Sequence, residues 1–158
     1  MAGGGQVQFD RGEANFSLFA SRLIFAVEKL EVVAGSVLWA DGPAGLLMES
    51  IEVTGYNVPA DQPAQGQSRQ IIGIMSVNGA GEYPFELVVV DAGAPGSGTD
   101  TVTLVVGDGI RTGENATPVT GMGFSYLAAG PVIPGDVQEI DFAIDPVAGV
   151  SRPASPID

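Results

Sequence analysis

The stretch VVVDAGAPGSGTDTVTLVV, residues 88–106, decides the fold class because two apolar, β-branched runs flank a loop of Gly, Pro and Ser. Runs of this kind that are bounded by turn residues are typical of strands joined in a hairpin. The loop carries an aspartate at each end, Asp91 and Asp100. We expect both side chains to lie exposed at the mouth of the loop, either as backbone caps or as metal ligands.

Alternation along the same stretch predicts which residues of the hairpin are buried. Successive side chains of a strand point to opposite faces, so every second residue shares one face. Apolar residues occupy these positions on both predicted strands and should pair across the hairpin. The predicted core-facing row consists of Phe85, Leu87, Val89, Val102, Leu104 and Val106.

The rest of the chain repeats this pattern of short alternating runs separated by turn residues. The 158 residues include 23 Gly and 11 Pro, which favours many turns. Asn78-Gly79 is the strongest short-range hairpin signal. The segment PVIPG is expected to join the last two strands, residues 122–130 and 136–144. The sequence therefore predicts an all-β fold, an antiparallel β-sandwich or flattened barrel of nine or ten short strands.

Composition sets the domain organisation and excludes several function classes. Residues 1–145 are expected to form one domain, and residues 146–158 a Pro-containing tail or linker. Six basic residues are scattered among nineteen acidic ones, for a net charge of −13, which argues against nucleic acid as a partner. The absence of His and Cys removes Ser-His-Asp triads, thiol nucleophiles and the usual zinc sites. We therefore expect no enzyme.

The sequence also gives an expectation for where in or outside the cell the protein lies. No apolar run approaches the roughly 18 residues that a membrane helix needs, so no membrane insertion is expected. The opening MAGGGQVQF lacks the charged and apolar regions of a signal peptide. We interpret the chain as a mature extracellular or cell-surface domain. A protein that stays in the cytoplasm, or a phage or capsid-type structural protein, is the alternative.

A family resemblance rests on GGG near the start, ANFSLFA, GSVLWAD and above all residues 83–106. This order resembles a small β-sandwich domain of bacterial secreted and cell-surface proteins, which begins with a Gly-rich strand. Its late hallmark has the form F-x-V-x-V-x-D-x-G-x-P-G-x-x-D, and it is found after anchor modules. The chain departs from it in a longer loop at residues 107–121 and in lacking the small-loop cysteines of many such domains. The resemblance implies an extracytoplasmic sandwich and no catalysis.

Two candidate ligand sites follow from residue type. Calcium prefers six to eight oxygen ligands, and Asp91 and Asp100 could supply carboxylates to a loop whose carbonyls turn inward. The competing interpretation is that each aspartate caps backbone N–H groups of the turn. Tyr56, which precedes a loop, is the best exposed aromatic for stacking on a glycan. Trp39 lies in an apolar strand, and we expect it in the core.

Carboxylates could also suggest a glycosidase, which needs two acids at a set separation across a cleft. The sequence does not give that separation, and with nineteen acids in 158 residues a solvated acidic surface is the better explanation. The candidates are Glu49, Glu52, Glu82, Glu86, Glu139 and Asp141. The predicted function is a structural or adhesive module that binds other protein modules or itself. A carbohydrate-binding module is the alternative.

Overall fold

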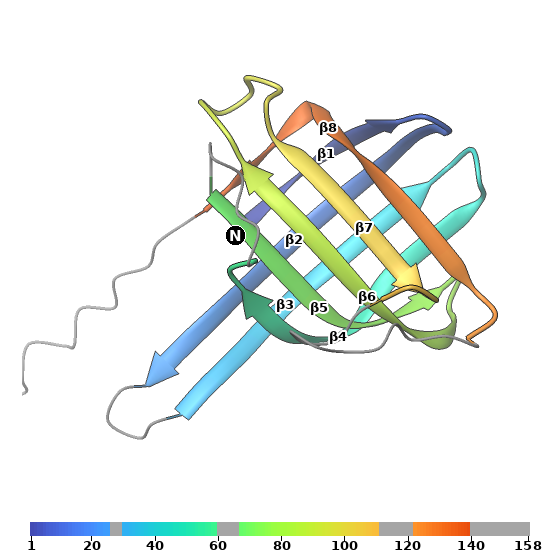
Figure 1. Cartoon of the computed structure of the whole chain (residues 1–158), viewed down its shortest axis with the longest axis horizontal. Helices are drawn as coiled ribbons and strands as arrows, with labels where there is room; N and C mark the ends of the chain where they lie inside the picture. Colours follow the sequence, from blue (N-terminus) through green and yellow to red (C-terminus); the bar gives the residue numbers. More distant parts are fainter. Residues whose placement is uncertain (26–29, 60–66, 111–121, 140–158) are drawn as a thin grey trace, which may run out of the picture.

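The computed structural model describes residues 1–25, 30–59, 67–110 and 122–139, which form an all-β fold (Figure 1). No helix occurs in these segments. The described residues form eight strands where the sequence predicts nine or ten, in part because β8 is continuous. The strands are β1 (Ala2–Phe9), β2 (Gly12–Phe25), β3 (Leu30–Asp41), β4 (Leu46–Asn57), β5 (Gln67–Val77), β6 (Ala80–Asp91), β7 (Thr101–Gly107) and β8 (Ser125–Gln138).

All eight strands belong to one sheet that closes on itself. Each strand pairs antiparallel with the next one in the chain, and β1 also pairs with β8, giving the order β1-β2-β3-β4-β5-β6-β7-β8 of a closed barrel. The prediction of an all-β antiparallel fold is confirmed. The predicted tail, residues 146–158, lies outside the described residues.

The predicted break between two C-terminal strands is wrong. β8 runs from Ser125 through PVIPG to Gln138 as one strand. It pairs with β7 up to Pro131, and with β1 from Val132 onward, where Pro134 lies at a register shift between Val132 and Gly135. Gly5 lies opposite Gly135 at this point, and a Cβ on either would collide with the facing backbone. Glycine is required there because the two strands approach each other so closely.

The two predicted hairpins are confirmed. Asn78 and Gly79 join β5 to β6, and both have positive φ, 52° and 72°, as a type I′ turn requires. In the β6–β7 hairpin, Leu87 lies opposite Leu104, and the rest of the row follows in register. All six side chains of the predicted core-facing row are buried.

The core fills the interior of the ring with apolar side chains from every strand. Trp39 is fully buried, as predicted, and is the largest side chain in this core. Its ring packs on Phe16 and Tyr126, with ring centroids 6.0 and 6.4 Å away. Inward-facing residues alternate with outward-facing ones along the strands, so the sequence pattern of period two fixes which side chains are enclosed.

One hairpin extends past the rest of the barrel. β2 and β3 pair without interruption from Asn15 opposite Ala40 to Phe25 opposite Leu30, at the far end of both strands. The neighbouring strands stop earlier: β1 pairs with β2 only as far as Phe19, and β4 pairs with β3 only at residues 38–41. Residues 21–25 and 30–36, called here the distal hairpin, therefore project from the barrel wall (Figure 1).

Candidate functional site

Asp100, one of the two predicted calcium ligands, is a buried structural residue. Its Oδ1 accepts a hydrogen bond from the Ala92 amide, and its Oδ2 accepts one from the Val137 amide, both at 2.9 Å. Its own carbonyl accepts from the amide of Val132. The prediction that Asp100 is exposed is wrong, because the side chain is enclosed between the β6–β7 loop and the end of β8.

Asp91 lies at the same end of the barrel in a half-buried position. Its Oδ2 accepts a hydrogen bond from the Glu139 amide at 2.9 Å, so it too binds the backbone that follows β8. Burial raises the pKa of Asp91, and the nearby charge of Asp136 raises this pKa further. Asp136 in turn accepts a hydrogen bond from the Gly96 amide in the loop. The aspartates thus connect the β6–β7 loop to β8.

The hydrogen bond from the Ala92 amide supports the capping interpretation for Asp100, whereas Asp91 accepts its hydrogen bond from the backbone that follows β8. Both oxygens of Asp100 and one oxygen of Asp91 already accept backbone hydrogen bonds. Within the described segments, no three acidic side chains are grouped as a metal ion would need. Calcium at Asp91 and Asp100 stays a prediction that these contacts do not favour.

We expect calcium to leave the stability of the protein unchanged apart from a general effect of divalent charge. A specific ion at a hundred times its dissociation constant would add about 2.7 kcal/mol to the free energy of unfolding. The measurement is the melting temperature in calcium, in magnesium at the same concentration and in EDTA. A rise of several degrees that is specific to calcium and is lost in Asp91→Asn would show that the loop holds an ion.

Tyr56, the predicted glycan-stacking residue, is half-buried and held by its neighbours. Its hydroxyl accepts a hydrogen bond from the terminal amine of Met1 at 3.1 Å. The guanidinium of Arg69 lies 5.8 Å from the centre of the Tyr56 ring and forms an ion pair with Glu139. Trp39 and Tyr126, two other aromatics that could have formed a sugar platform, are buried. Stacking on a glycan by Tyr56 stays a prediction.

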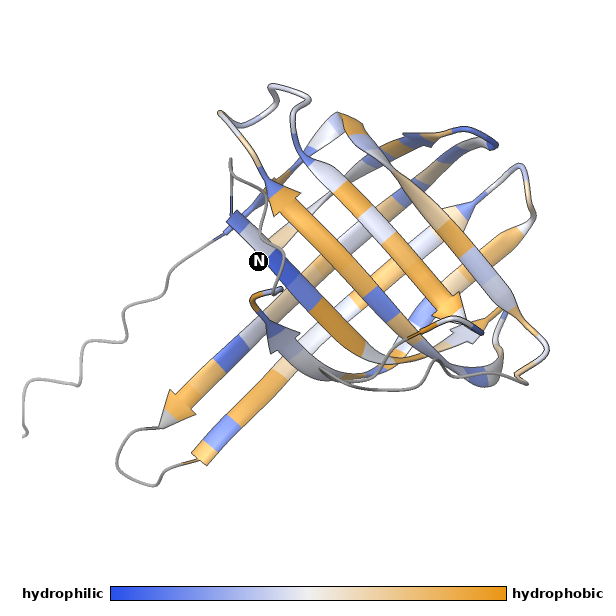
Figure 2. Ribbon diagram, in the orientation of Figure 1, coloured by the Kyte–Doolittle hydropathy of each residue, from blue (hydrophilic) through white to orange (hydrophobic). Residues whose placement is uncertain are grey.

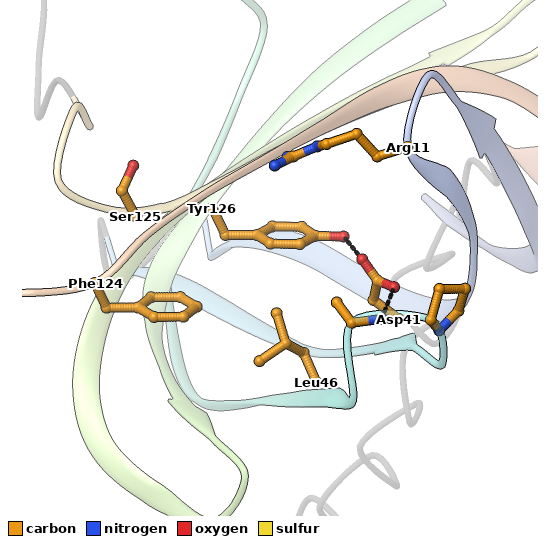
Figure 3. A pocket seen from close by; sticks show the side chains of 8 residues that line it. Arg11, Asp41, Leu46, Phe124, Ser125 and Tyr126 are labelled. Carbon is orange, nitrogen blue, oxygen red and sulfur yellow. Dashed lines mark hydrogen bonds between the residues drawn. The ribbon is translucent and has the colours of Figure 1, made fainter.

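A hollow of about 290 Å³ lies at the end of the barrel that carries the β3–β4 turn (Figure 3). Its lining mixes apolar and polar groups but includes one acidic side chain, Asp41, instead of the facing pair that a glycosidase needs. Arg11 at its rim donates to the Leu127 carbonyl at 2.8 Å. The lining residues are Arg11, Asp41, Pro43, Ala44, Leu46, Phe124, Ser125 and Tyr126.

Two of the lining residues, Asp41 and Tyr126, form a chain of buried hydrogen bonds with Trp39. The indole N–H of Trp39 donates to the Tyr126 hydroxyl at 2.9 Å. That hydroxyl donates to Oδ2 of Asp41 at 2.8 Å, as Figure 3 shows. Oδ1 of Asp41 accepts from the Ala44 amide in the β3–β4 turn. Burial raises the pKa of Tyr126; the hydrogen bond from Trp39 lowers this pKa, and the bond to Asp41 raises it. These hydrogen bonds connect the core to the β3–β4 turn, and each of the polar groups named here has a hydrogen-bond partner.

The distal hairpin presents the strongest candidate for an interaction surface. β4 turns away from β3 after residues 46–49, at bulges between Ser50 and Glu52 and between Val53 and Gly55. Across this divergence, the Val37 amide bonds to the Ser50 hydroxyl at 2.9 Å. Within the described part of the chain, residues 30–36 then have no strand beside them except β2. An edge of this kind offers unpaired N–H and C=O groups to another strand.

The outer face of β2 and β3 adds apolar side chains to this free edge. Five of them lie 37–52% exposed and share one face, because their positions alternate with those of the buried residues. Apolar colour marks the projecting ends of both strands in Figure 2. We call this surface the apolar outer face; its residues are Phe19, Leu23, Leu30, Val32 and Leu38.

The opposite face of the distal hairpin is also partly apolar. Ile24 is 65% exposed there, beside an ion pair in which Nε of Arg22 lies 3.5 Å from a carboxylate oxygen of Glu31. Both partners are largely exposed, so the pair contributes little stability. On this same face Val33 is half-buried and packs against the barrel core, so only the end of the hairpin beyond Val33 has both faces in water. A two-stranded hairpin in water is only marginally stable by itself. We therefore expect the distal hairpin to become more stable when another surface packs against it.

Comparisons with known protein families, with curated proteins and with solved structures give no match for this chain. The described part of the chain contains no apolar helix of the length that crosses a membrane.

Proposed function

We propose that this chain is a non-catalytic structural module that associates with copies of itself through the distal hairpin, at the surface of a bacterial cell. The observation that carries the proposal is the free strand edge at residues 30–36, next to the apolar outer face. The resemblance to bacterial cell-surface domains supports the location. The absence of His and Cys and the occupied carboxylates of Asp41 and Asp100 argue against a catalytic role.

Charge distribution also supports self-association. The chain carries a net charge of −13, so two copies repel each other over most of their surfaces. The outward-facing positions of the hairpin, from Ser17 to Leu23 on β2 and from Leu30 to Leu38 on β3, hold only apolar residues and serine. Depletion of charge is the compositional mark of an interface core. Two copies can meet here without bringing like charges together.

Sedimentation equilibrium of the purified protein over a wide concentration range tests the proposal. We expect the average mass to rise toward twice that of one chain. Added salt should strengthen the association, because it screens repulsion between like-charged chains. Binding driven by opposite charges would weaken in salt.

A matched pair of variants assigns the contact to the hairpin. Val32→Glu adds a charge to the apolar outer face and should raise the dissociation constant at least about tenfold, or 1.4 kcal/mol. Leu127→Glu adds the same charge on β8, at a residue that is 55% exposed, and should change the dissociation constant little. A monomer at every concentration would overturn the proposal.

A further inference from the structure

We infer that two copies pair through their β3 edges, antiparallel, with a two-fold axis at Val33. This inference rests on the proposed self-association and names its geometry. The free stretch covers residues 30–36, and Val33 is its midpoint. Centring the axis there pairs the largest number of free residues, because Leu30 then faces Ser36 of the second copy, and Val32 faces its Ala34. The result is a continuous four-stranded sheet of two β2–β3 hairpins.

Symmetry restricts the alternatives. A two-fold contact uses the same patch on both copies, so a like-charged pair at the axis would occur in every dimer. Glu31 is the single charged residue in the free stretch. With the axis at Val33, Glu31 faces Gly35 of the second copy, which has no side chain to oppose it. Glu31 also has its own counter-charge in Arg22, 3.5 Å away on β2.

The same register joins the apolar surfaces of both copies. Residues that face each other across an antiparallel pair lie on the same side of the sheet. Leu30 and Val32 of one copy therefore extend the apolar outer face of the other, and Val33 meets Val33 on the inner side. The edge contact supplies backbone hydrogen bonds, and the side chains on either side of it supply burial. A pairing of this length is smaller than a standard interface, so we expect a reversible dimer.

Single cysteines test this register, because the chain has none of its own. Val33→Cys places the two thiols opposite each other across the axis, within the roughly 4.4–6.8 Å between Cα atoms that a disulfide spans. Leu30→Cys is the matched control on the same strand. In this register the two Leu30 positions lie about 20 Å apart, since six residues at about 3.4 Å separate them along the strand.

Under mild oxidation, at a concentration where sedimentation shows dimer, Val33→Cys should form a covalent dimer and Leu30→Cys should not. Leu30 is 52% exposed and Val33 is half-buried, so random collision would favour the control. A mixture of Leu30→Cys and Ser36→Cys should give a mixed disulfide, because these residues face each other. Thermal unfolding checks that each variant folds.

The outcomes separate the register from the proposed function. Dimerisation of the unmodified protein without cross-linking of Val33→Cys, or with equal cross-linking of Leu30→Cys, would overturn the β3 pairing and leave self-association standing. A protein that stays monomeric would remove both. Selective cross-linking at Val33, together with the mixed disulfide, would establish the two-fold axis.

Discussion

Replacing Asp100 with Ala is expected to lower the free energy of unfolding by about 3 kcal/mol. The substitution removes both oxygens that accept the Ala92 and Val137 amides. Val137 is fully buried, so its N–H would lose its partner in a place that water does not reach. A buried donor without a partner costs about 1–3 kcal/mol, and hydrogen bonds to a charged acceptor are stronger than neutral ones.

Urea unfolding followed by the fluorescence of Trp39, the single tryptophan of the chain, measures this effect. Asp100→Asn keeps one carbonyl acceptor and should lie between the wild type and Asp100→Ala. Asp136→Ala is the matched control, because its hydrogen bond to the Gly96 amide is exposed, and it should cost less than about 1 kcal/mol. Equal effects of Asp100→Ala and Asp136→Ala would show that Asp100 does not secure the loop.

Replacing Tyr126 with Phe should lower the free energy of unfolding by about 2–3 kcal/mol. The hydroxyl accepts from Trp39 and donates to Asp41, so its loss leaves a buried donor and a buried carboxylate oxygen without their partner. The ring itself remains, and packing is preserved. Tyr83→Phe is the control, since Tyr83 is half-buried against Phe124 and its hydroxyl makes no hydrogen bond among the described residues.

The effect of Tyr126→Phe should depend on pH in a defined direction. The pKa of Tyr126 in the folded protein is raised above the ordinary value of 10.0. The stability that its neutral hydroxyl contributes is therefore complete below about pH 10 and is lost as the pH rises further, because the unfolded chain ionises first. The difference between wild type and variant should narrow above that pH. A difference that stays constant would mean that ionisation of Tyr126 is not linked to folding.

The alternation of apolar and polar residues predicts many of the strands and their buried faces, but it does not predict that the sheet closes into a barrel. The β6–β7 register and the burial of Trp39 follow from period two, because a strand with one enclosed face must alternate. Pairing of β1 with β8 joins the two ends of the described sheet, and no local pattern specifies it. PVIPG suggests a loop by composition, yet its residues continue β8: Pro131 pairs with Thr101 of β7, and Pro134 lies at the register shift against β1.

The candidate sites are harder to predict from the sequence than the fold, because the burial and contacts of their residues depend on segments that are distant in the chain. Asp100 is buried by the end of β8, far along the chain from its own loop. The distal hairpin is defined by where β1 and β4 stop pairing, which alternation does not report. One signal was present: β2 and β3 are apolar at outward-facing positions, Phe19, Leu23 and Val32 among them, where a wall strand in water is usually polar.

Amide hydrogen exchange along β3, measured at low and at high protein concentration, tests self-pairing of the free edge most directly. N–H groups alternate in direction along β3, and the Val37 N–H points away from β2 to Ser50, so the free N–H groups are those of Glu31, Val33 and Gly35. These three should exchange quickly in dilute protein and more slowly when dimer forms, because the second copy accepts hydrogen bonds from them. The β6–β7 hairpin, paired on both sides, should exchange at the same rate in both samples. Exchange at Glu31, Val33 and Gly35 that stays unchanged while the dimer fraction rises would contradict the pairing.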